Sequence, residues 1–378
     1  MFRIKIDNEN YKGGNKSMKK MFFALALFVS IFTLAACGQL EEVEIALITD
    51  YGDIDDESFN QGTWEGIVAY AEENDIAHEY YRPADVSDSD YINSIDTAVD
   101  DGAQIIVTPG FLFERAIYES QQNHPDVKFI LLDAEPLSED EEYVVGDNTL
   151  SIFYEEHESG FLAGYAAVKD GHTNLGYMGG IAVPAVVRFG IGFVAGAHFA
   201  ADEAGVTLDF PENRFTYLGT FDAGADVETQ AAGWYDGGTE LIFAAAGGAG
   251  GSVMSAAEDA DAWMIGVDVD QSAESDRVLT SATKALAESV QQALAAHYDD
   301  DAFPGGETWY LGAADDGVAL PMETSRFTDF TQADYDAIYD EISAGGFMVP
   351  SNYDELLTFF DVHDLGALGF EEDTITGS

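Results

Sequence analysis

The strongest constraint on the fold is a regular alternation along the chain of short apolar runs with longer amphipathic stretches. The apolar runs, which end at or next to Gly or Asp, are VEIALITD (43–50), QIIVTPG (104–110), KFILLDA (128–134), NLGYMGG (174–180), RFTYLGT (214–220), ELIFAAAGG (240–248) and AWMIGVDVD (262–270). We predict helices over 59–74, 90–102, 112–124, 157–171, 189–205, 226–238, 252–261 and 280–298. Strands that alternate with helices of this length imply right-handed crossovers and parallel sheets. The sequence therefore predicts an α/β fold.

The N-terminal segment has the layout of a signal peptide. In MKKMFFALALFVSIFTLAAC (18–37), two lysines precede an uncharged stretch that ends in small residues and Cys37, the only cysteine of the chain. This stretch is shorter than the roughly 18 residues of a membrane-spanning helix. Its end, LAAC (34–37), resembles the lipobox of bacterial lipoproteins, in which the cysteine is lipidated. We expect residues 1–36 to be a signal peptide and Cys37 to carry the lipid; the alternative is a plain secretory signal with an incidental cysteine.

The chain is strongly acidic. Nine of the 15 basic residues and 69 of the 71 acidic residues remain from Cys37 onward, so the mature chain has a formal net charge of −60. Such a chain repels nucleic acid and anionic lipid head groups. Its self-repulsion is relieved at high ionic strength, because the Debye length falls to about 3 Å at about 1 M salt. We therefore expect a surface adapted to a salt-rich extracytoplasmic environment.

Length and composition indicate a globular protein with more than one core. The chain from residue 37 to 378 is too long for a single hydrophobic core and suggests two domains. With 47% hydrophobic and 12% aromatic residues, it is not a disordered acidic tail.

The residues that follow the predicted strands should converge, since ligands of open parallel sheets bind beyond the carboxyl ends of the strands. These residues are Asp50, Gly110, Asp133, Gly179, Gly180, Gly247, Gly248 and Asp268. Carboxylates accept hydrogen bonds, and glycines allow a ligand to approach the backbone. Because no lysine lies in these loops, they suit a neutral, hydroxyl-rich molecule better than a phosphate.

Several segments carry a resemblance to a known family. TDYGDIDDESFNQGTWEGI (49–67), HESGFLAGYAA (157–167), LIFAAAGGAGGSV (241–253) and WMIGVDVDQ (263–271) resemble the basic membrane protein family of purine-nucleoside-binding lipoproteins, which serve ABC importers. The resemblance implies a type I periplasmic binding protein: two Rossmann-like lobes with the ligand in the interlobe cleft. It implies lobes of 37–147 plus about 277–312 and of 148–276 plus about 313–378. Glu57 departs from the family, which often has a basic residue there.

The resemblance also implies a set of ligand-binding residues. Phe59 and Phe189 would stack on the two faces of the base. Asp50, Asn60 and Asp133 would meet the base edge, and Gly247, Asp268 and Lys284 would hold the ribose.

Each of these assignments has a plainer alternative. Phe59 is also suited to the core at the start of a helix, and Asp50 and Asp133 are suited to capping the next helix. Phe193 and Phe199 share a predicted helix with Phe189. Gly247 is equally suited to a helix-start turn, and Lys284 to the role of a surface cation. Solvated or turn-forming roles suit the remaining acids of the opening motif, Asp53, Asp55, Asp56 and Glu57.

Competing chemistries find less support. A calcium EF-hand loop beginning at Asp53 would need Gly at its sixth position and an acid at its twelfth, where Ser58 and Trp64 stand. TDYGDIDD approaches the motif of calcium-dependent nucleoside hydrolases, but Ile48 occupies the first acid position. GGAGGS lacks the lysine of a P-loop.

We therefore expect no catalytic residues, metal or cofactor. The predicted function is that of a monomeric, lipid-anchored binding protein, which delivers a nucleoside to an ABC permease in the membrane. The alternatives are a nucleoside hydrolase and a binding protein for a sugar or an autoinducer-like polyol.

Overall fold

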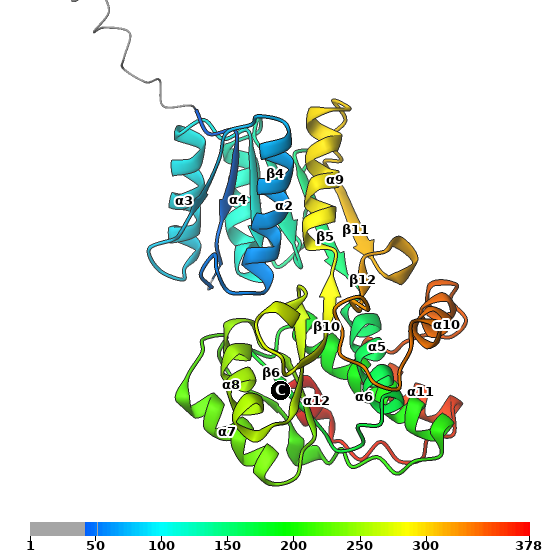
Figure 1. Cartoon of the computed structure of the whole chain (residues 1–378). Coiled ribbons are helices and arrows are strands. Elements are labelled where there is room, and N and C mark those ends of the chain that lie inside the picture. The colour runs from blue at the N-terminus through cyan, green and yellow to red at the C-terminus, as the bar shows by residue number, and fades with distance from the viewer. Residues whose placement is uncertain (1–41, 51) are drawn as a thin grey trace, which may run out of the picture. The chain divides into compact units, whose positions relative to one another are not determined.

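The computed structural model describes residues 42–50 and 52–378, and residues 43–378 form one compact unit with two sheets (Figure 1). The predicted signal peptide and Cys37 lie outside the described residues. In the first sheet the strand order is β11-β5-β4-β3-β1-β2, and in the second it is β12-β10-β9-β8-β6-β7. All strand pairs are parallel except β10 with β12. The predicted α/β class and parallel sheets are confirmed.

The strands are short and mostly buried. Those of the first sheet are β1 (Ile45–Ile48), β2 (His78–Tyr81), β3 (Ile105–Pro109), β4 (Lys128–Leu132), β5 (Thr149–Tyr154) and β11 (Glu307–Leu311). Those of the second are β6 (Leu175–Gly179), β7 (Phe215–Tyr217), β8 (Leu241–Ala245), β9 (Trp263–Asp268), β10 (Val278–Lys284) and β12 (Val318–Ala319). Read in order, β1 to β5 of the first sheet correspond to β6 to β10 of the second.

Helices flank both sheets (Figure 1). Their bounds are α2 (Phe59–Glu73), α3 (Asp88–Asp100), α4 (Glu114–Asn123), α5 (Glu156–Lys169), α6 (Pro184–Ala204), α7 (Ala225–Asp236), α8 (Gly250–Ala260), α9 (Leu286–Tyr298), α10 (Gln332–Ser343), α11 (Tyr353–Val362) and α12 (Glu372–Thr376). Single 3₁₀ turns are η1 (Phe111–Phe113), η2 (Glu212–Arg214), η3 (Gly247–Ala249), η4 (Gln271–Ala273) and η5 (Ala313–Asp315). The helix pairs α2 with α9 and α6 with α5 occupy corresponding places, because each follows corresponding strands.

The predicted helix over 280–298 is wrong in its first part. Residues Val278–Lys284 form strand β10, and α9 begins only at Leu286. The strand is almost entirely buried. A strand buried on both faces shows no alternation, so its pattern cannot be told from that of a buried helix.

The chain passes between the two sheets after β5, after β10 and after β11. The lobe ranges given by the resemblance stay a prediction. A division by sheets would differ from them at two strands, because β5 pairs with β4 in the first sheet and β10 pairs with β9 in the second. After the last passage, α11 and α12 pack against α6 beside the second sheet.

Glycines let α5 and α6 approach each other closely. A Cβ at Gly192 would lie 1.9 Å from the carbonyl oxygen of His157, and one at Gly196 would lie 2.1 Å from that of Phe161. By length and composition α6 could cross a membrane, but most of it is buried within this fold. The helix is therefore accounted for as a core helix between α5 and the second sheet.

Candidate ligand-binding site

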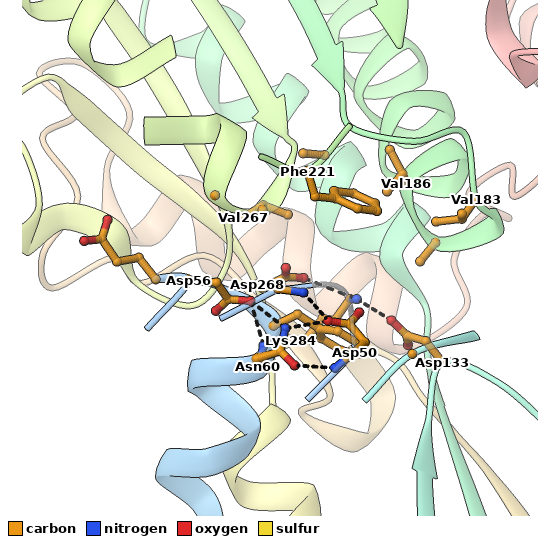
Figure 2. Close-up of a pocket in the computed structure, with 18 of the residues that line it drawn as sticks. Asp50, Asp56, Asn60, Asp133, Val183, Val186, Phe221, Val267, Asp268 and Lys284 are labelled. Atoms are coloured by element: carbon orange, nitrogen blue, oxygen red, sulfur yellow. Dashed lines mark hydrogen bonds and ion pairs between the residues drawn. The ribbon is translucent and has the colours of Figure 1, made fainter. Parts of the chain in front are cut away.

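The strand ends of both sheets meet around one cavity of about 390 Å³ (Figure 2). Small-molecule sites typically enclose about 300–1,000 Å³. All the ligand-binding residues predicted from the sequence line this cavity: Asp50, Phe59, Asn60, Asp133, Phe189, Gly247, Asp268 and Lys284. The structure thus brings the whole set together, while their contacts with a ligand stay a prediction.

Two aspartates occupy corresponding positions at the ends of corresponding strands. Asp133 follows β4 of the first sheet, and Asp268 ends β9 of the second. Both have left-handed backbones, with φ of 57° at Asp133 and 67° at Asp268. A left-handed backbone is uncommon for residues other than glycine, and such residues gather at functional sites.

Lys284 lies between these aspartates. Its ammonium nitrogen is 2.7 Å from Oδ2 of Asp133 and 3.2 Å from Oδ1 of Asp268. The same nitrogen lies 4.6 Å from the ring centre of Phe59 and 5.4 Å from that of Phe189. The Lys284 side chain is only 3% exposed, so the interpretation as a surface cation is wrong.

A further carboxylate, which the sequence analysis missed, stands behind Lys284. Glu156 begins α5, is fully buried, and accepts a 2.6 Å hydrogen bond from Nε of Arg188 on α6. Its Oε1 is 3.6 Å from the Lys284 nitrogen. A glutamate within EEHES has no pattern that distinguishes it from an exposed residue at a helix start, so no local signal could have found it.

The pKa values in this buried cluster follow from burial and charge. Burial lowers the pKa of Lys284, but Asp133, Asp268 and Glu156 outweigh it and raise that pKa above its ordinary value. For Glu156, burial raises the pKa, but Arg188 and Lys284 outweigh burial and leave it lowered. The pKa of Asp133 is raised by burial, against the effect of Lys284. The lysine is therefore held as a cation.

The Asn60 side-chain amide makes hydrogen bonds on the side of the cavity that the first sheet forms. Its Nδ2 donates to Oδ1 of Asp50 at 2.8 Å and to Oδ2 of Asp56 at 2.9 Å, and its Oδ1 accepts from the Asp50 amide at 3.2 Å. This amide is thus oriented by its neighbours (Figure 2). It fixes the Asp50 loop against the start of α2.

Among the acids of the opening motif, Asp56 forms a turn. Its Oδ1 accepts from the backbone N–H groups of Ser58 and Gln61, and its Oδ2 accepts from that of Asn60. Asp53 pairs with Arg82 at the surface. The turn-forming interpretation is therefore confirmed for Asp56, although Asp53, Asp55, Asp56 and Glu57 also line the cavity.

Apolar groups form the opposite wall. Phe189 lines the cavity and packs edge-on against Phe243, with the two ring centres 5.8 Å apart. Phe193 and Phe199 of the same helix contact other core aromatic rings and do not line it. Phe221, Val183 and Val186 add apolar surface that the sequence analysis did not assign to the site (Figure 2).

Gly247 also has the second role considered for it. It begins the 3₁₀ turn η3 that leads into α8, with a left-handed φ of 53°. A Cβ there would lie 3.5 Å from the Phe221 ring. The residue is both a helix-start turn and part of the cavity wall.

The site has the chemistry of binding. Aromatic and aliphatic surface faces carboxylates that accept hydrogen bonds, with one buried cation beneath them. Within residues 42–50 and 52–378, no cluster of His, Cys, Asp or Glu is arranged to hold a metal ion. The two sheets thus enclose a cavity whose size and lining suit a small molecule.

Comparison with known proteins identifies the family. The family model for the Bmp family, described as PnrA-like ABC transporter substrate-binding proteins, matches residues 43–352, and the chain belongs to this family. It is 30% identical to the ABC transporter nucleoside-binding protein BmpA of Lactococcus lactis, over 82% of this chain and 95% of that protein. It is 27% identical to basic membrane protein A of Borreliella burgdorferi, over 89% and 98%.

Solved structures confirm the fold. An ABC transporter solute-binding protein from Aeropyrum pernix has a TM-score of 0.71 and 20% identity, over 86% of this chain and 98% of that one. A second, from Conexibacter woesei, has a TM-score of 0.65 and 22% identity, over 82% and 99%. The architecture predicted from the resemblance is thereby confirmed.

Proposed function

We propose that this substrate-binding protein captures a nucleoside, with a purine as its base, and delivers it to an ABC permease. The observation that carries the proposal is the position of Lys284 beside two aromatic rings and two carboxylates from opposite sheets. Flat apolar surface suits a base, and carboxylates beside an ammonium suit hydroxyl groups. The name of the Lactococcus lactis relative, a nucleoside-binding protein, supports the same ligand class.

In this proposal the cavity has two halves. Phe59 and Phe189 hold the faces of the base, and Asp50, Asn60 and Asp133 lie at its edge. Gly247, Asp268 and Lys284 hold the ribose. Carboxylates only accept hydrogen bonds, so both the ring N–H groups and the ribose hydroxyls are matched by acceptors.

The direct test is mass spectrometry of small molecules released when the purified protein is denatured. We expect a nucleoside. Calorimetry with inosine, adenosine, hypoxanthine and ribose then measures which part of the ligand is recognised. Tight binding of free ribose alone would favour a sugar-binding protein, and formation of free base from inosine with calcium would favour a hydrolase.

Phe59→Ala tests the stacking. Loss of one base-stacking ring should cost about 1–3 kcal/mol of nucleoside binding. Phe199→Ala is the control, because Phe199 shares the helix of Phe189 but does not line the cavity. Unchanged nucleoside affinity in Phe59→Ala would contradict the assignment.

We further propose that the protein is anchored to the extracytoplasmic face of the membrane by lipid on Cys37. Intact-mass measurement of the mature N-terminus and cell fractionation test this. Recovery of the wild-type protein wholly in the soluble fraction, with an unmodified N-terminus, would contradict it. Cys37→Ser should release the protein from the membrane.

The charge of the mature chain supports a salt-rich setting for this surface. Thermal stability should rise between about 0.1 and about 2 M NaCl and then level off, because screening is nearly complete at a Debye length of a few Å. A melting temperature independent of salt would remove this argument.

A further inference from the structure

Ser58 occupies the N-cap position of α2 without capping the helix. An N-cap serine ordinarily accepts a hydrogen bond from the backbone N–H two or three residues on. The Ser58 side chain makes no such bond. The Asp56 carboxylate replaces it, since it accepts from the N–H groups of Asn60 at 3.0 Å and Gln61 at 3.1 Å. The Ser58 hydroxyl is thereby released for another partner.

That partner lies on the other sheet. The Ser58 hydroxyl donates to Oδ2 of Asp268 at 2.5 Å, in a contact between residues 210 positions apart. Ser58 is fully buried and does not itself line the cavity, whereas Asp268 does. Because Lys284 faces the other carboxylate oxygen, Asp268 is held on both sides.

A second bond between the same two loops supports the first. Nε2 of Gln271 donates to the carbonyl oxygen of Glu57, the residue before Ser58, at 2.7 Å. The other end of the Gln271 amide accepts from the Val267 N–H at 3.2 Å, so the side chain is fixed on β9. Gly266 leaves room for it, since a Cβ there would lie 2.3 Å from Oε1 of Gln271.

We propose that Ser58 is a positioning residue of the ligand site, which orients the Asp268 carboxylate from the opposite sheet while Gln271 keeps the two loops in register. The inference rests on the proposed function in one respect, that Asp268 receives the ribose hydroxyls. Ser58 then acts on ribose recognition through Asp268 and has no contact with the base.

The test compares Ser58→Ala with wild type for binding of inosine and of hypoxanthine by calorimetry. Hydrogen bonds to charged groups have free energies that correspond to about tenfold in affinity or more. We expect inosine affinity to fall about tenfold and hypoxanthine affinity to stay nearly unchanged. An equal fall for both ligands, or no fall for inosine, would overturn the inference.

Ser87→Ala is the matched control. Ser87 is the N-cap of α3 and does cap its helix, accepting from the Asp90 N–H at 3.2 Å. Its loss should lower thermal stability and leave inosine affinity unchanged. The same substitution at two N-cap serines thus separates loss of a helix cap from loss of a positioning contact.

A double-mutant cycle with Asp268→Ala shows whether Ser58 acts through Asp268. In the Asp268→Ala background, Ser58→Ala should have little further effect on inosine affinity, and additive losses would contradict the inference. The same cycle measured on unfolding of the ligand-free protein needs no nucleoside. If the wild type bound no nucleoside, the proposed function would fall. Non-additivity in unfolding would still support the Ser58–Asp268 contact, and additivity would overturn it.

Discussion

Asp133 and Asp268 stand at corresponding strand ends of the two sheets, with the same left-handed backbone and the same lysine beside them. They differ in how they are held. Both oxygens of Asp268 are engaged, by Ser58 and by Lys284. Asp133 uses Oδ2 for Lys284, whereas its buried Oδ1 has no hydrogen-bond partner among the described residues. The second sheet thus offers a carboxylate held at both oxygens, each of which can still accept a further donor, and the first offers one that is held at a single oxygen.

The strands next to these aspartates lead to charges of opposite sign. Glu156 follows β5 of the first sheet, and Lys284 ends β10 of the second. An unpaired buried charge is costly, so each of these groups depends on the others. Lys284 contacts carboxylates of both sheets, so its substitution should have the largest effect on the free energy of unfolding.

Lys284→Met should lower the free energy of unfolding by about 3–5 kcal/mol, the usual cost of leaving buried charges without their partner. Chemical denaturation measures this loss. Lys169→Met is the control, because Lys169 pairs with Glu203 at the surface, with side chains 27% and 42% exposed. A surface pair contributes about 0–1 kcal/mol. Similar losses in the two variants would mean that the buried carboxylates do not depend on Lys284.

Substitution of the two aspartates should separate their roles. Asp268→Ala should cost nucleoside binding about 1.5–3 kcal/mol and narrow the difference between nucleoside and free base, because a charge-assisted contact to ribose is lost. Asp133→Asn should instead change the ratio of inosine to adenosine affinity, because an amide donates as well as accepts. Calorimetry with these ligands measures both. If both variants changed ligand preference in the same way, Asp133 and Asp268 would not have the different roles proposed for them.

Glycine-to-alanine changes in the helix pairs α2–α9 and α5–α6 should have a smaller effect on the free energy of unfolding. Gly66 of α2 approaches Ala287 of α9, where a Cβ would be 2.7 Å from backbone atoms, but at Gly192 of α6 the distance is 1.9 Å. Gly192→Ala should therefore lower the free energy of unfolding by about 1–3 kcal/mol through overpacking, and by more than Gly66→Ala does. Thermal or chemical unfolding of both variants compares the pairs.

Gly233→Ala on α7 is the control for helix propensity. No atom outside its local backbone lies within 4 Å of a Cβ at Gly233, so this variant should gain about 0.5–1 kcal/mol. A Gly192→Ala variant as stable as wild type would show that α5 and α6 can separate without cost.

Most of the fold could be predicted from the sequence, because particular residue types mark the ends of the strands. Runs such as VEIALITD end at or next to an aspartate or glycine, and seven of the strands were predicted from such runs. Strand β10 was not predicted, because VLTSATK continues into the helical pattern that follows without a residue that marks the end of a strand. The edge strands β2 and β11 were not predicted either, because their apolar and polar residues alternate only weakly.

The site was less accessible to sequence reasoning wherever a residue acts through a distant partner. Asp133 and Asp268 could be predicted, because each follows a strand and strand ends converge. Ser58 and Glu156 could not, because a serine before a helix and a glutamate at a helix start have ordinary local explanations. Only contacts with residues that line the cavity connect these two to it: Ser58 contacts Asp268, and Glu156 contacts Lys284.

The three passages between the sheets also set the order in which the fold can be completed. β11, the edge strand beside β5, comes from residues Glu307–Leu311, after every strand of the second sheet except β12. A chain synthesised from its N-terminus therefore has an open edge at β5 while strands β6 to β10 of the second sheet are being made. Open edges are templates on which strands of other chains pair. Until Leu311 has been made, β5 is such an edge.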